Sequence, residues 1–177
     1  MEESSKATNI AIGKPTEQSS TDWHAESRKA VDGDSDGEFC HGSCTLTKIE
    51  FDPWWKTNLL KSRSVYSISL KNREDCCSMR LAGAEIRVGN NEMFHENQLC
   101  GTVTSEMVNH GSVIDIQCND DGAPIEGQFV SVQVKSKRGA LSLCEVEVYA
   151  GEVDREFDVT GPHVTVGPPI QGMNKLK

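Results

Sequence analysis

The run NREDCCSMRLAGAEI, residues 72–86, joins an unusual pair of cysteines to the beginning of a strand pattern. Cys76 and Cys77 are neighbours in the chain, and Arg73 and Arg80 stand on either side of them. Apolar and polar residues then alternate over 84–89, and a period of two over four to eight residues indicates a strand with one buried face. The run therefore predicts a loop rich in polar chemistry that leads into a β-strand.

The same alternation occurs along much of the chain, at 65–70, 112–118, 129–134 and 144–150. In the first of these segments it predicts that Tyr66, Ile68 and Leu70 share one face. Clusters of glycine, asparagine and aspartate separate the segments, as is typical of turns. Residues 24–31 are compatible with one or two helical turns, and no segment has a longer helical period. The pattern predicts an all-β protein, either a sandwich or a barrel.

Composition excludes several classes of partner. The chain has 177 residues, a net charge of −9 and a pI of about 5.0, so we expect no binding to a nucleic-acid backbone. No stretch approaches about 18 apolar residues, so we expect no membrane insertion. The first residues lack the apolar core of a signal peptide. The length suits one domain with tails.

Seven cysteines are many for a chain of this length. No pair has Cys-x-x-Cys spacing, which argues against a zinc ribbon or a thioredoxin-type site. A disulfide framework in a secreted, extracellular protein fits better, and the odd number leaves one thiol over. The cysteines are Cys40, Cys44, Cys76, Cys77, Cys100, Cys118 and Cys144.

The adjacent Cys76 and Cys77 have three possible states. They can belong to two different bridges, they can act as thiolate ligands to a metal, or they can bond to each other in a small strained ring. The flanking arginines would repel a metal cation. From the residues alone the other two states stay open.

The chain resembles the F-type lectins, the fucose-binding lectins first described in eel. The resemblance rests on NREDCCSMRLAGAEI together with DPWWKTNLL, LCEVEVYA, NIAIGKPTEQSST and AVDG, and it covers about residues 9–150. It implies an all-β, discoidin-like β-sandwich jellyroll. Residues 1–8 and 151–177 would then be an N-terminal tail and a C-terminal tail or linker, and the stretch 154–166 can add an edge strand.

The resemblance implies a sugar site around the cysteine pair. Cys76 and Cys77 would bond to each other and place their apolar ring against the sugar. Arg73 and Arg80 would donate hydrogen bonds to the hydroxyls, and Asp75 would orient them. These roles agree with the chemistry of a sugar, which has an apolar face and a rim of hydroxyls that suits the multi-donor guanidinium group.

One position departs from the family pattern. Counting back 27 positions from Arg73, where the family has histidine, reaches Leu46. Leucine cannot replace the hydrogen bond of an imidazole, and an unsatisfied sugar hydroxyl costs about 1–3 kcal/mol. We therefore expect binding of fucosylated glycans that is weakened, shifted in specificity or lost. Nearby polar residues that can take over the contact are Thr45, Thr47 and Lys48, whereas the place of His41 in its HGSCT run suggests a structural role.

The acidic run DGDSDG, residues 32–37, is typical of either a turn or a calcium site. An EF-hand is excluded, because it needs a bidentate glutamate at the twelfth position of the loop, which here is Ser43, and because helical flanks are missing. The resemblance implies a structural calcium ion that fastens the loops without touching the sugar. Its ligands would be the carbonyl oxygens of Lys29, Asp34 and Cys144 and the side chains of Asp32, Ser43 and Glu145.

The resemblance also implies the disulfide pairs Cys44–Cys144, Cys76–Cys77 and Cys100–Cys118. Cys40 would be left over, either as a buried free thiol or as a cross-link in a homo-oligomer. The residues contain no nucleophile–base pair or carboxylate pair that points to an enzyme. Two functions remain: a secreted, non-enzymatic lectin with an altered pocket, or a domain that kept the fold for protein contacts or oligomer assembly.

Overall fold

The computed structural model describes residues 8–151. The two predicted tails and the edge strand expected at 154–166 lie almost wholly outside these residues. The strands of the described part are β1 (Thr16–Gln18), β2 (Glu50–Phe51), β3 (Trp54–Lys71), β4 (Ala84–Gly89), β5 (Gln98–Thr102), β6 (Val113–Gln117), β7 (Ile125–Val134), β8 (Arg138–Gly139) and β9 (Glu145–Gly151).

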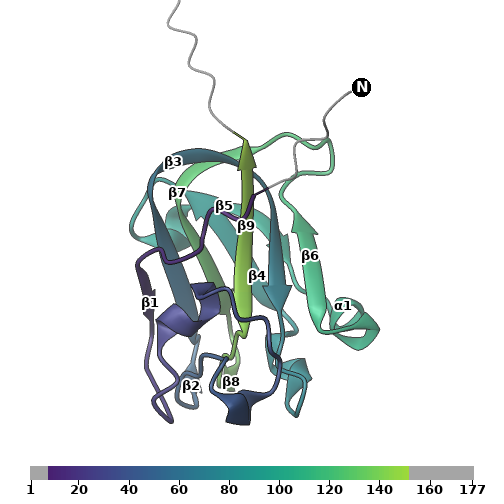
Figure 1. The fold of residues 1–177 in the computed structure, drawn as a ribbon. Helices are drawn as coiled ribbons and strands as arrows, with labels where there is room; N and C mark the ends of the chain where they lie inside the picture. The colour runs from purple at the N-terminus through teal and green to yellow at the C-terminus, as the bar shows by residue number, and fades with distance from the viewer. Residues whose placement is uncertain (1–7, 152–177) are drawn as a thin grey trace, which may run out of the picture.

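A single long strand, β3, organises the sheet. Within the described residues β3 pairs antiparallel with β1, β6, β7 and β9. The register of its pairing with β7 shifts between Asn58 and Arg63, and the backbone at Leu60 is left-handed with φ 71°. Such an irregularity bends a strand and increases its twist. As a result β3 arches over one end of the molecule, as Figure 1 shows.

The two halves of β3 lie in opposite layers. The first half pairs with β1 and β7, and the layer continues through β4 to β5. The second half pairs with β6 and β9. The short β2–β8 pair lies at the end of the molecule opposite the arch (Figure 1). Two antiparallel layers packed face to face make a β-sandwich, which confirms the predicted fold class.

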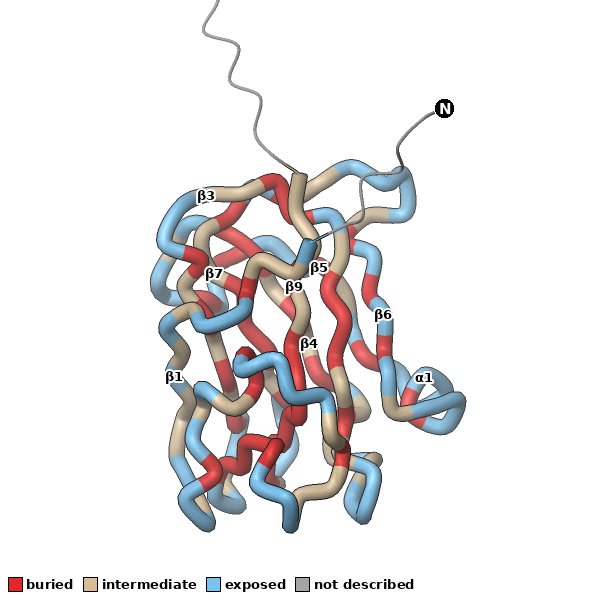
Figure 2. The backbone as a smooth tube through the Cα atoms, viewed as in Figure 1, coloured by how far each residue is buried: buried red, intermediate tan, exposed pale blue. Residues whose placement is uncertain are grey.

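The core lies between the layers. Ile86 on β4, Val130 and Val132 on β7, and Val148 on β9 have no exposed surface, as the alternation in the sequence predicts. Figure 2 shows these buried stretches along the strands, with exposed residues in the loops. The prediction for Tyr66 is wrong, because this side chain is 43% exposed. The register of β3 against β9 shifts beside it, between Val65 and Ser67, and this shift interrupts the period of two.

Short helices connect the strands: η1 (Ser27–Val31), η2 (Phe39–His41), η3 (Ser78–Leu81), η4 (Phe94–Glu96) and α1 (Ser105–His110). η1 is the turn expected within 24–31. The α1 helix was not predicted from the sequence, because six residues are too few to show a helical period. Thr104 caps it by accepting a hydrogen bond from the Met107 backbone N–H at 3.2 Å. No helix within 8–151 is long and apolar enough to cross a membrane.

Three disulfides fasten the loops to the sandwich, and they are the pairs that the resemblance implied. Cys44–Cys144 joins the loop after η2 to the start of β9, and Cys100–Cys118 joins β5 to the residue after β6. Cys76–Cys77 closes the small ring just before η3. The bridge that spans 100 positions constrains the unfolded chain most, by about 4.7 kcal/mol in the loop-entropy model.

Candidate functional site

A pocket of about 400 Å³ contains all of the predicted sugar-binding residues except Asp75. Its walls come from loops that are far apart in the sequence, including the segment before η1, η2, the segment before β2, and the loop that ends in η3. The residues that line it are Asp22, Trp23, Phe39, Leu46, Thr47, Ile49, Arg73, Cys76, Cys77, Arg80 and Ala140.

Arg73 is held in place from two sides. Its Nε and Nη2 donate to the two carboxylate oxygens of Asp75 at 2.6 and 2.7 Å. The Phe39 ring lies under the guanidinium at 4.2 Å from its centroid, which is a cation–π contact. The Arg73 hydrogen bonds lower the pKa of Asp75 to about 2, so the carboxylate stays ionised at neutral pH. Because a guanidinium has five N–H donors, three remain for a ligand.

Arg80 stands on η3 at the opposite side of the cysteine pair. Its side chain is half-buried, and its guanidinium has no hydrogen-bond or ion-pair partner among residues 8–151. All of its donors are therefore available to a ligand. The Arg80 backbone N–H donates to the Cys77 carbonyl at 3.0 Å, which closes the turn behind the pocket.

Asn72 positions both arms of this loop and was missed by the sequence analysis. It is 2% exposed. Its Nδ2 donates to the Ser78 carbonyl at 2.9 Å, and its Oδ1 accepts the Arg73 backbone N–H at 2.9 Å. A buried amide with its hydrogen bonds satisfied fixes local geometry. The signal in the sequence was an asparagine at the end of an apolar strand.

The bonded Cys76 and Cys77 lie between the two arginines and are exposed. Cys77 has a left-handed backbone with φ 64°. Strained conformations of this kind gather at functional sites. The sulfur pair presents an apolar surface without hydrogen-bond donors to the space that the guanidinium groups flank.

The floor of the pocket is apolar. Leu46 is 6% exposed and packs in a small cluster with Ala25 and Ala140, against which Phe39 also packs. The hydroxyls of Thr45 and Thr47 accept the backbone N–H groups of Leu143 and Leu141. These threonines are thus committed to the fold, which argues against their replacing an imidazole at Leu46.

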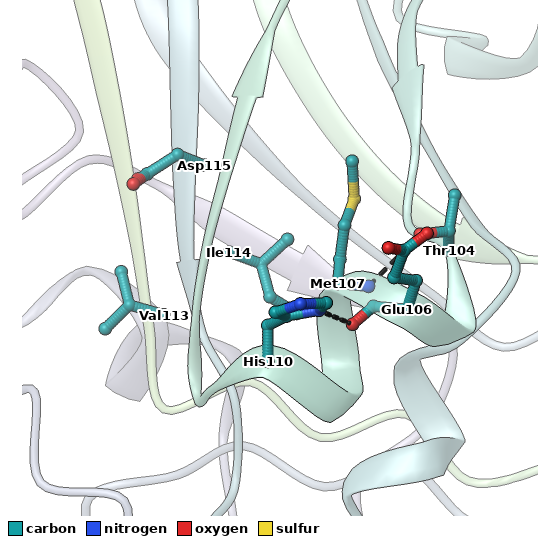
Figure 3. Close-up of a pocket in the computed structure, with 7 residues that line it drawn as sticks. All are labelled: Thr104, Glu106, Met107, His110, Val113, Ile114 and Asp115. Carbon is teal, nitrogen blue, oxygen red and sulfur yellow. Dashed lines mark hydrogen bonds between the residues drawn. The ribbon is translucent and has the colours of Figure 1, made fainter.

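A second hollow, of about 480 Å³, lies between α1 and β6 (Figure 3). Two of its polar side chains are used locally: His110 Nδ1 bonds to the Glu106 carbonyl at 2.7 Å, and Thr104 caps the helix. It contains no arginine and no disulfide. The pocket around Arg73 and Arg80 is therefore the better candidate for the functional site.

The comparisons with known proteins identify the family of this chain. A family model described as a NedA-like, galactose-binding domain matches residues 29–132. Fucolectin-6 of Anguilla japonica is 37% identical over 147 residues, which cover 80% of this chain and 75% of that protein. The chain belongs to the F-type lectin family.

Solved structures of similar proteins share the fold of this F-type lectin. The F-lectin (fucolectin) from the serum of striped bass, Morone saxatilis, matches with a TM-score of 0.73. It is 31% identical, and the match covers 83% of this chain and 48% of that chain. The lectin domain of lectinolysin complexed with Lewis b antigen has a TM-score of 0.70 with 30% identity, over 81% of this chain and 97% of that chain. These matches confirm the discoidin-like sandwich. The relatives are lectins, and this domain is not an enzyme.

The residues expected to hold calcium have a chemistry that fits a cation. Glu145 is 2% exposed, and its carboxylate accepts the Gly33 backbone N–H at 3.2 Å. Burial raises the pKa of Glu145 to about 8, and the neighbouring charge of Asp32 adds to the rise. Lys29 and Asp32 line one hollow together with Gly42, the residue before Ser43.

Side chains alone do not make this metal site. Among residues 8–151 no three His, Cys, Asp or Glu side chains gather closely enough to hold a metal. The expected set depends instead on the carbonyl oxygens of Lys29, Asp34 and Cys144. Ser43 Oγ donates to the Asp36 carbonyl at 2.6 Å, so this hydroxyl still has its lone pairs free for a cation. Calcium stays a prediction.

The expectation of a buried thiol at Cys40 is wrong, because Cys40 is exposed and unbonded. It lies on η2, whose partly exposed Phe39 turns toward the pocket while the next side chain faces solvent. His41 is exposed, and its Nδ1 bonds to Asp36 Oδ2 at 2.7 Å. Cross-linking of two chains through Cys40 stays a prediction.

Proposed function

We propose that this domain is an extracellular lectin that binds fucosylated glycans in the pocket between Arg73 and Arg80. The observation that carries the proposal is the geometry of that pocket, in which two guanidinium groups flank the Cys76–Cys77 bond. The similarity to fucolectins and to a lectin domain complexed with Lewis b antigen supports it.

The pocket matches both surfaces of a sugar ring. The apolar sulfur pair contacts the C–H face of the ring, while Arg73 and Arg80 donate to the hydroxyls at its edge. Asp75 and Phe39 already hold Arg73 in one orientation. Less side-chain entropy is therefore lost when the ligand binds.

Leu46 makes the pocket different from the family pattern. The hydroxyl that would meet an imidazole there meets the apolar floor, at a cost of about 1–3 kcal/mol. This corresponds to a loss of about ten- to a hundred-fold in affinity for a ligand with a hydroxyl at that place. Free L-fucose is then a weak ligand, and glycans with other contacts are favoured.

A glycan array in the presence of calcium, followed by isothermal titration with the best ligand, tests the proposal. Arg80→Ala should abolish binding, because it removes every donor on one side of the ring. Arg28→Ala is the matched control, since Arg28 is exposed, pairs with Glu26 and lies outside the pocket. If no glycan on the array binds the folded protein, a role in protein contacts or oligomer assembly takes first place.

We also propose that calcium binds at Glu145 and Asp32 and acts only on structure. The Cys44–Cys144 bond and this site both join the loops beside the pocket to the start of β9. The three disulfides support an extracellular location, where oxidising conditions preserve them.

A further inference from the structure

Two large apolar side chains stand exposed in the wall of the pocket that contains the arginines. Trp23 is 78% exposed and Ile49 is 59% exposed, and both line this pocket. Neither belongs to the buried floor formed around Leu46. Single exposed apolar side chains are common on proteins, but two that share a pocket with unpaired guanidinium donors indicate a binding surface.

The loop that carries Trp23 is fastened to the pocket floor. The Asp22 N–H donates to the Leu46 carbonyl at 2.9 Å, and the Leu46 N–H donates to the Ala25 carbonyl at 3.1 Å. The Asp22 carboxylate also accepts the Trp23 backbone N–H at 3.1 Å. The position of Trp23 relative to the floor is therefore set by the fold.

A second set of hydrogen bonds connects the same loop to the segment that carries Ile49. The Lys48 backbone N–H donates to Ser20 Oγ at 2.9 Å. Ser19 Oγ donates to the Glu50 carboxylate at 2.6 Å, and Ser20 Oγ donates to the same oxygen. Trp23 and Ile49 thus form a surface that exists before a ligand arrives, which lowers the entropy lost on binding.

The backbone at Trp23 is left-handed, with φ 51°, and so is the backbone at His24, with φ 54°. This conformation is uncommon for a bulky residue and costs free energy. It holds the indole out in water beside the pocket. The indole N–H has no hydrogen-bond partner among residues 8–151, so Trp23 offers an apolar face and a free donor together.

We propose that Trp23 and Ile49 form a second, apolar subsite for the sugar that is linked to the one held by Arg73 and Arg80. This inference rests on the proposed function. A pocket of about 400 Å³ lies in the range that holds drug-sized ligands and is larger than one pyranose ring fills. The C–H face of a neighbouring ring covers the indole, whose N–H donates to a ring substituent. The domain therefore selects the end of an oligosaccharide over a free monosaccharide.

Isothermal titration with L-fucose and with a panel of fucosylated oligosaccharides, Lewis b among them, tests the inference. We expect the parent to bind at least one oligosaccharide about tenfold or more tightly than L-fucose, the order expected for covering an aromatic face. Trp23→Ala should remove most of this difference, because it weakens oligosaccharide binding by a larger factor than L-fucose binding. Ile49→Ser should act in the same direction with a smaller effect.

Phe51→Ala is the matched control, because Phe51 is 70% exposed on β2 and does not line the pocket. It should retain the preference for the oligosaccharide. If Trp23→Ala binds every oligosaccharide as tightly as the parent does, or the parent prefers none to L-fucose, the subsite is refuted while the lectin function stands. If neither L-fucose nor any oligosaccharide binds the parent, the proposed function fails and the inference fails with it.

Discussion

At the scale of single residues, our proposal assigns to Leu46 the choice of the hydroxyl pattern that the pocket accepts. It is nearly buried among Ala25 and Ala140, at the place where the family pattern has histidine. A floor of this kind supplies dispersion contacts but no hydrogen bond. In the proposed function this one side chain sets the preference of the pocket, while the arginines supply general affinity for hydroxyls.

The substitution Leu46→His should create or strengthen binding of L-fucose. The imidazole gives a hydroxyl the partner that it now lacks, for a net gain of about 0.5–1.5 kcal/mol, or up to about tenfold in affinity. Isothermal titration measures the change. Adding Arg80→Ala to this background should remove the gain, since both groups hold the same sugar. A Leu46→His protein that folds normally and binds fucose no better than the parent contradicts the assigned position of Leu46.

The Arg73–Asp75 pair makes a prediction about pH. The pKa of Asp75 in the folded protein is about 2, below its ordinary value of 3.8, because Arg73 donates to it. A lowered carboxyl pKa means that the pair is intact above the ordinary value and is lost as the pH falls through about 2. The contribution of this pair to sugar affinity should therefore stay constant from pH 8 down to about pH 4. Isothermal titration at several pH values measures it.

Asp75→Asn is the companion variant. The neutral amide cannot accept both guanidinium donors, so Arg73 loses a fixed orientation. We expect about tenfold weaker sugar binding at every pH, the order of one charge-assisted hydrogen bond. Unchanged affinity in Asp75→Asn would show that Phe39 alone holds Arg73 in place.

At the scale of elements, the contact between β4 and β7 tolerates no added atom at Gly127. A Cβ there would lie 2.5 Å from the Gly89 backbone nitrogen and 2.7 Å from Val88 Cγ1. Because both neighbours belong to a paired strand, they cannot move aside freely. Gly127 lies two residues beyond the last β4–β7 pair, Gly89–Phe129, and pairs with Arg63 of β3.

Gly127→Ala should therefore lower the free energy of unfolding by about 1–3 kcal/mol, the usual cost of overpacking. Urea unfolding followed by tryptophan fluorescence measures it. Gly111→Ala is the control, because its Cβ would meet nothing within 4 Å. Equal midpoints for the two variants would mean that β4 and β7 are less tightly packed than the structure indicates.

At the scale of the whole molecule, calcium should raise the melting temperature. A cation that binds the folded state alone stabilises it by mass action, and a hundred-fold excess over Kd corresponds to roughly 5–10 °C. Thermal melts with calcium and with chelator measure this difference. Asp32→Ala and Glu145→Gln should abolish it, while Asp115→Ala on β6 should keep it. Identical melts of the parent in calcium and in chelator would exclude the site.

The sequence by itself determined several of the strands and the chemistry of the arginine loop. Alternation is a local property, so β4, β7 and β9 were predicted near their observed positions. It misplaced Tyr66, beside a register shift in β3, and it did not show β1, β5 or the first half of β3. Arg73, Asp75 and the cysteine pair lie within a few residues of one another, so one loop must bring them together. The pairing of distant cysteines came from the family resemblance, because many pairings satisfy the same spacing.

Only the tertiary structure decided which distant residues complete the pocket. Trp23, Phe39, Ile49 and Ala140 lie on separate loops, and nothing in their local sequence marks them as neighbours of Arg73. They meet because strand pairing and the Cys44–Cys144 bond gather these loops at one end of the sandwich. Contacts of this kind depend on the register and bend of strands such as β3. The physical reason is that side-chain periodicity is encoded in the chain, whereas proximity between loops is a property of the packed layers.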